Sequence, residues 1–182
     1  MKKIVLVCLF SLLTVHSAYA QEAKQLPQKA SVNITTDAKN ILGTTYAENS
    51  VKKIEFFIKS GNYAAAKQTV DSVSEWIADA AEYHTDLFKT LKKVENADTQ
   101  ATIERDAAIK FAVMRDKVLF LQAKIFIHDG QKRKAVDNLV EVVKSQPNTE
   151  LGFQAYKLLQ DIGFTYGVEI LPVKTDVIKP AQ

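Results

Sequence analysis

Three carboxylates, Asp79, Glu82 and Asp86, form the most compact set of potential metal ligands in the sequence, with His84 between them. At spacings of i, i+3 and i+7 the carboxylates share one face of a helix, where their oxygens could hold a hard cation. His84 instead follows the apolar stripe of the same helix. A solvated acidic face explains the pattern without a ligand. We therefore predict no metal site and no bound cofactor.

The pair His128-Asp129 combines the two residue types that form an oriented general base in hydrolases. Adjacent residues on a helix point about 100° apart, which gives such a pair poor geometry. A histidine at the end of a helix also interacts favourably with the helix dipole. Serine-hydrolase elbows, glycine-rich phosphate loops and paired zinc motifs are absent from the sequence. We predict a protein that is not an enzyme and has no catalytic residues.

The N-terminus has the pattern of a secretory signal peptide, residues 1–20. Lys2 and Lys3 precede an apolar run, and Ala18 and Ala20 supply the small residues that signal peptidase recognises. The run of about 12 residues is too short to span a bilayer as a helix, and no later stretch is long enough. We expect cleavage after Ala20 and a bacterial periplasmic location, with secretion beyond the periplasm as the alternative.

Cys8 is the single cysteine of the chain and lies inside the predicted signal. Val7 is not the small residue that precedes a lipidation cysteine, so we expect no lipid anchor. The 162 residues that remain of the 182 after cleavage contain no thiol, which excludes disulfides, thiol catalysis and thiolate metal sites. An apolar core alone must stabilise this single domain, and 47% hydrophobic residues suffice for one.

Basic residues are concentrated at Lys132-Arg133-Lys134 and at Lys92-Lys93. No aromatic residues alternate with them to stack on bases, so we interpret the triplet as a solvated start of a helix. Loss of Lys2 and Lys3 with the signal leaves 22 of the 24 basic residues against 21 acidic ones, a formal charge of +1. The sequence therefore predicts no nucleic-acid partner.

Apolar residues recur at steps of three and four along most of the chain, and glycine and proline are almost absent between Gly61 and Gly130. This spacing predicts an all-α fold of antiparallel helical hairpins. We expect Asp98 or Thr99 to cap the third helix and Asn148 or Thr149 the fifth. The predicted helices cover residues 50–60, 62–94, 99–128, 131–146 and 150–162. The predicted regions are a leader at 21–36, a helical domain at 37–163 and an extended tail at 164–182.

Two segments repeat one pattern. Residues 61–66 and 130–135 share Gly-x-x-x-x-Ala, and apolar residues follow at equivalent positions further on. The two glycines are 69 residues apart by their numbers, about two periods of 34 residues. The matching positions are Gly61, Tyr63, Ala66, Val70, Val73, Ala123, Gly130, Ala135, Leu139, Val142 and Pro147.

This pattern resembles the tetratricopeptide repeat family, in which a glycine separates two helices, an aromatic and an alanine follow it, and a proline ends the unit. Lys132 replaces the aromatic residue in the second unit, and Ala78 replaces the proline in the first, so the helix through Ala78 is expected to run on. The resemblance implies stacked hairpins in a short solenoid or bundle. An unrelated bundle, in which glycine merely breaks helices, is the alternative.

The resemblance also implies that the first helix of each unit lines a concave face that holds a peptide. The outward candidates for this partner surface are Glu55, Lys59, Lys117, Phe120, Lys124, His128 and Gln154. The preferred hypothesis is an exported protein that mediates protein–protein interaction in the bacterial envelope. The alternative is a small ligand- or metal-binding helical bundle with a chaperone or stress role, which the acidic cluster around Glu82 and the aromatic hairpin interior suggest. The sequence does not predict the identity of the partner or the oligomeric state.

Overall fold

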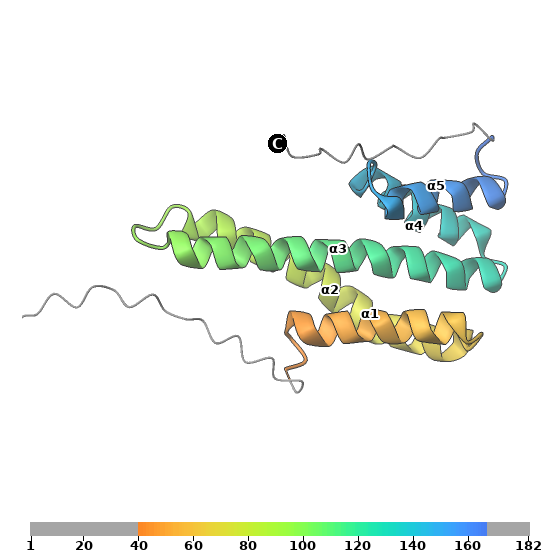
Figure 1. The fold of residues 1–182 in the computed structure, drawn as a ribbon, viewed down its shortest axis with the longest axis horizontal. Coiled ribbons are helices and arrows are strands. Elements are labelled where there is room, and N and C mark those ends of the chain that lie inside the picture. Colours follow the sequence, from red (N-terminus) through yellow and green to blue (C-terminus); the bar gives the residue numbers. More distant parts are fainter. Residues whose placement is uncertain (1–39, 167–182) are drawn as a thin grey trace, which may run out of the picture. The chain divides into compact units, whose positions relative to one another are not determined.

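The structure is a computed structural model that describes residues 40–166 (Figure 1). The predicted signal peptide, the leader and most of the predicted tail lie outside these residues. The described part is all-α, as the apolar spacing predicts. Its five helices are α1 (Thr44–Lys59), α2 (Tyr63–Leu91), α3 (Asp98–His128), α4 (Lys132–Ser145) and α5 (Glu150–Asp161).

The helices pack in two layers. Each helix packs against the next in the chain, and α3 also contacts α1 and α5. Figure 1 shows α1, α3 and α5 in front, with α2 and α4 behind them. Short turns join consecutive helices, so neighbours in sequence run antiparallel and the three front helices run in the same direction. The first, third and fifth helices therefore share one exposed side.

The α2–α3 hairpin is much longer than the rest of the fold. These helices have 29 and 31 residues, against 16 in α1. Ala78 lies within α2, and the helix continues to Leu91 because alanine retains the backbone N–H that proline would remove. The hairpin consequently extends past the N-terminal end of α1, as Figure 1 shows.

Local hydrogen bonds decide where the helices begin. Thr149 caps α5 as predicted, because its side chain accepts a bond from the amide of Gly152 at 3.2 Å. The predicted cap at Asp98 or Thr99 is wrong: Ala97 is the N-cap, and Asp98 lies in the first turn of α3, where its charge is favourable for the helix dipole. α1 begins at Thr44, before the predicted start at residue 50.

The front helices end in the same way. Gly61, Gly130 and Gly163 follow α1, α3 and α5 with φ values of 75°, 74° and 80°. In each turn the amide after the glycine donates to a carbonyl five residues earlier, at 2.8, 2.7 and 2.9 Å. This is the Schellman motif, whose left-handed residue is strained unless it is glycine. The repeat seen in the sequence at two glycines therefore has a third equivalent at Gly163.

Two apolar clusters form the core. The first joins α1, α2 and α3 around Ile54, Ile77 and Phe111, which are fully buried. The second joins α3, α4 and α5 around Leu139. Phe120 packs against both clusters and so connects them. Within residues 40–166, no helix combines the length and apolar character needed to cross a bilayer.

Candidate functional site

The acidic cluster lies in an open groove on α2. Asp79, Glu82 and Asp86 line this groove together with Lys89 and Arg115. The Nζ of Lys89 lies 3.1 Å from Asp86, so one carboxylate is already paired. Among residues 40–166, no group of three or more His, Cys, Asp or Glu side chains is placed to hold a metal ion. The arrangement is a mixed-charge surface, in which Lys89 pairs with Asp86 and Arg115 is bound to Asp116.

His84 links the two long helices. Its Nδ1 lies 2.6 Å from Oε2 of Glu104 on α3, and its ring stacks on Phe111 with centroids 5.3 Å apart. Gln100 donates to the other oxygen of Glu104 at 2.9 Å. The histidine on the apolar stripe thus has a polar partner and an aromatic one across the hairpin. It stabilises the packing of α2 against α3.

His128 closes the opposite end of the hairpin. Its ring stacks on Tyr63, at the start of α2, with centroids 3.8 Å apart and planes 10° from parallel. Its Nδ1 lies 3.0 Å from Asp129. The residue is at the last position of α3, where a positive charge is favourable for the dipole. These contacts account for the His-Asp pair as part of the packing between helix ends.

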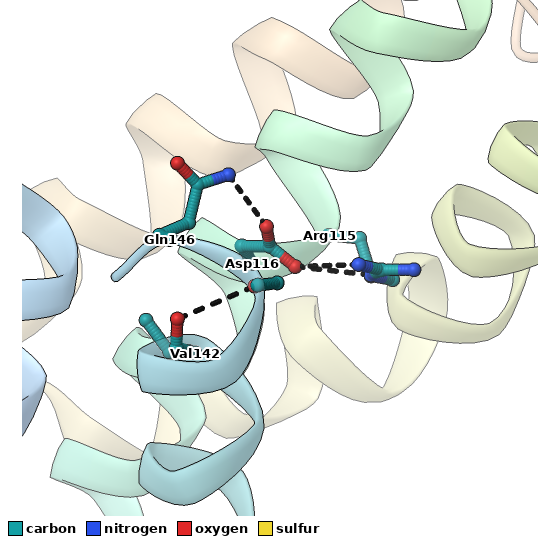
Figure 2. Close-up of polar contacts among 5 residues, drawn as sticks. Arg115, Asp116, Val142 and Gln146 are labelled. Carbon is teal, nitrogen blue, oxygen red and sulfur yellow. Dashed lines mark hydrogen bonds and ion pairs between the residues drawn. The ribbon is translucent and has the colours of Figure 1, made fainter. Parts of the chain in front are cut away.

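Asp116 is the one buried charged residue among residues 40–166, and sequence reasoning missed it. It is 1% exposed. Arg115 donates to its Oδ1 at 2.8 and 3.1 Å, and Gln146 donates to its Oδ2 at 2.7 Å (Figure 2). Its position on a stripe with Ala112 and Leu119 is the signal that could have identified it, since an acid among apolar residues requires a partner. The set joins the end of α4 to the middle of α3.

Four of the predicted surface residues meet on α1 and α3. The Nζ of Lys117 lies 2.7 Å from Oε1 of Glu55, which joins the two helices. The Nζ of Lys124 lies 5.8 Å from the ring centroid of Phe120. Phe120 is only partly exposed because it also packs against the core. These residues place two separate contacts, one charged and one between a lysine and an aromatic ring, on the front layer.

The other predicted surface residues are more dispersed. Lys59 is exposed at the last position of α1. Gln154 is exposed on α5 and bonds to Glu150 at 2.8 Å. His128 is exposed beyond Lys124, at the end of α3. The structure therefore distributes the predicted set over all three front helices.

The outward face of the front layer also carries apolar residues. Lys52, Phe56 and Lys59 follow at steps of four and three, opposite the buried Ile54 on α1, and Phe56 is 65% exposed. On α3, Val113 is 49% exposed and lies one turn before Lys117. Periodicity identifies Phe56 as an outward residue, but the sequence analysis did not include it among the candidates. We define the outward face as these residues of α1 and α3 with Lys110, Lys117 and Lys124.

No family model matches the chain, and no curated protein or solved structure is significantly similar to it. The repeated helix ends and the outward face are therefore the observations from which we infer a function.

Proposed function

We propose that this protein is an exported, non-catalytic helical-repeat protein that binds another polypeptide in the bacterial envelope. The binding site is the outward face, together with Gln154 on α5. The supporting observation is that three parallel helices present one side that no other described helix covers, with Phe56 and Val113 exposed among lysines. Exposed apolar groups within a charged rim are typical of protein-binding surfaces.

A relationship to tetratricopeptide repeats is part of the proposal. In this interpretation α1 and α2 are the two helices of one unit, and the end of α3 and α4 are those of a second. α5 would be the first helix of a third. The equivalent turns at Gly61, Gly130 and Gly163 support this assignment. The turns at Gly61 and Gly130 are about two repeat periods apart, and the additional length of the α2–α3 hairpin accounts for the second period.

The charges of the outward face favour an acidic partner. Its five lysines outnumber the three carboxylates on the same sides of α1 and α3, which are Glu48, Glu55 and Asp106. Glu55 is already paired with Lys117. A segment with an apolar side chain flanked by carboxylates would place the apolar group against Phe56 and its charges near the lysines. Such complementarity increases association rate and specificity more than affinity.

Site-specific photo-crosslinking in the native envelope tests this function. A photoreactive amino acid would replace Lys59 or Lys124 on the outward face, or Asp71 on α2 as the matched control, because Asp71 is exposed in the back layer. We expect one protein to crosslink from both outward positions and not from position 71. Equal crosslinking from all three positions, or none from the outward face, would contradict the proposal.

Export is tested separately. The chain recovered from the periplasmic fraction of a bacterial host is expected to begin at Gln21, because cleavage after Ala20 is the reaction that the signal pattern predicts. A chain that retains its N-terminus in the cytoplasm would contradict the export component without affecting the binding component.

A further inference from the structure

An open groove lies between α1 and α2, and none of its lining residues belongs to the outward face. Its volume is about 520 Å³, within the range of about 300–1,000 Å³ that small-molecule sites have. Ser50, which is buried, and Thr69, which is half-buried, form its floor. Among the described residues, no valine, leucine, isoleucine or methionine lines it. The groove therefore lacks the large apolar pocket that anchors a peptide or a partner helix.

The hydroxyl groups in this groove are available as acceptors. Ser50 and Thr69 each donate to a backbone carbonyl one turn earlier in their own helix, at 2.9 and 2.8 Å. Ser72, on the same side of α2, donates to the carbonyl of Thr69 at 2.7 Å. Because a hydroxyl has one proton and two lone pairs, each oxygen can still accept a bond. A ligand that fits the groove must therefore bring several donors of its own.

The exposed rim of the groove supplies amide groups and one charge. The side chains of Asn49 and Gln68 have no hydrogen-bond partner within residues 40–166. Lys53 is the one charged residue among the described lining. Its Nζ lies 5.7 Å from the ring centroid of Phe57, and no carboxylate of the described part pairs with it. A positive charge beside hydroxyl and amide groups fits a ligand that has both a carboxylate and several hydroxyls.

The same charge argues against a second copy of the chain as the occupant. About a two-fold axis, the Lys53 side chains of both copies would face each other without a carboxylate between them. Like charges in such a position oppose association.

The aromatic residues of the groove indicate the shape of the ligand. Tyr46 and Phe57 are half-buried and line the groove eleven positions apart on α1, which is about 16 Å at 1.5 Å per residue. Lys53 lies between them in the helix. A sugar ring has a face of C–H groups that packs on an aromatic side chain, and hydroxyls at its edge that donate and accept. A short chain of such rings matches the length of the groove and its polar floor.

We propose that the groove between α1 and α2 binds a short acidic oligosaccharide. Its carboxylate lies at Lys53, and its hydroxyls donate to the oxygens of Ser50 and Thr69. Its ring faces pack on Tyr46 and Phe57. This inference goes beyond the proposed function, because it concerns a different surface and a different class of ligand.

Titration of the full chain with defined probes tests the proposal. The probes are trigalacturonate, which is acidic, maltotriose, which is a neutral trisaccharide, and tetraglutamate, which is acidic but not a sugar. Nuclear magnetic resonance of the side-chain amides of Asn49 and Gln68 reports binding in the groove. We expect trigalacturonate to shift both signals with a Kd of about 1 mM or below, and maltotriose to bind about ten-fold more weakly.

Two variants separate the charge from the hydroxyl groups. Lys53→Gln should weaken trigalacturonate binding about ten-fold and maltotriose binding by less than about two-fold, since only the acidic sugar has a carboxylate. Thr69→Val keeps the shape of the side chain but removes the acceptor, so it should weaken both sugars about five-fold. Lys67→Gln is the matched control and should change neither, because Lys67 is exposed on α2 but does not line the groove.

Three results would overturn the proposal. The first is no binding of trigalacturonate at about 10 mM. The second is an equal loss of binding in Lys53→Gln and in the control Lys67→Gln, because the charge would then act from outside the groove. The third is tetraglutamate binding as tightly as trigalacturonate at the same amide signals, which would show that the groove recognises acidic peptides.

Discussion

The side-chain amide of Gln146 donates a 2.7 Å hydrogen bond to the buried carboxylate of Asp116 (Figure 2). The two residues are 30 positions apart in sequence. Because the backbone N–H of Gln146 also closes the last turn of α4 on Val142, the bond connects the end of that helix to the centre of α3. The turn between α4 and α5 is thereby held in place by a charged group inside an apolar layer.

Removing this carboxylate should destabilise the fold. Asp116→Ala leaves the amide of Gln146 without its acceptor, and we expect a loss of about 2 kcal/mol in the free energy of unfolding. A double-mutant cycle with Gln146→Ala, measured by urea denaturation, should give a coupling of about 1 kcal/mol or more. Asp106→Ala is the matched control, because Asp106 is paired with the adjacent Arg105 but is exposed; its cost should be below about 0.5 kcal/mol. If both substitutions lower the free energy of unfolding by similar amounts, burial does not determine the contribution of Asp116.

Two glycines should respond differently to alanine. A Cβ at Gly152 would overlap the backbone carbonyl of Gln146, whereas a Cβ at Gly61 meets nothing within 4 Å and is opposed only by the positive φ. We expect Gly152→Ala to cost about 3 kcal/mol, since backbone atoms must move. Gly61→Ala should cost about 1 kcal/mol. Thermal and urea denaturation compare the two directly, and the reverse order would contradict the close approach of α5 to the α4–α5 turn.

Phe120 should control the cooperativity of unfolding. It is the side chain that packs against both apolar clusters, so Phe120→Ala should cost about 3 kcal/mol and also broaden the unfolding transition. The control Phe56→Ala, at an exposed aromatic residue of α1, should change stability by less than about 0.5 kcal/mol. A mutant of Phe120 that unfolds as sharply as the native protein would show that the two clusters are coupled elsewhere.

The ion pair between Glu55 and Lys117 should contribute little to stability. Both side chains are partly exposed, so Lys117→Glu should cost less than about 1 kcal/mol, and high salt should reduce the effect. The reversed pair, Glu55→Lys with Lys117→Glu, should recover most of the loss. If the reversed pair is no more stable than the single variant, the contact does not join α1 to α3 in solution.

The outward face can be separated from the core by mutation. Phe56→Asp and Lys59→Glu should leave the unfolding midpoint nearly unchanged, because both positions are exposed. Under the proposed function, the same variants should lower capture of the envelope partner by about ten-fold, since a central aromatic anchor carries much of an interface. Asp71→Lys on α2 serves as the charge-change control and should leave capture unchanged.

The helical class and most helix ends follow from the amino-acid sequence alone. Two local signals act over only a few residues: the spacing of apolar residues at three and four, and the glycines at 61, 130 and 163. Their effect therefore does not depend on the rest of the fold. Two predicted helix starts are wrong, because the residues that resemble a start lie inside a helix. Ser50 resembles a helix start, yet its hydroxyl bonds to the carbonyl of Tyr46 at 2.9 Å within α1. Asp98 resembles a cap but lies inside the first turn of α3.

The partners of these residues depend on how the helices pack against each other. Asp116 could be recognised in the sequence as an acid among apolar residues, but its bond to Gln146 depends on the packing of α4 against α3. Likewise, the apolar spacing predicts that Leu87 widens the buried face of α2, but Leu87 is 48% exposed. The periodicity of apolar residues predicts which side chains share one side of a helix. Their burial and their hydrogen-bond partners depend on how far a second helix extends along that side.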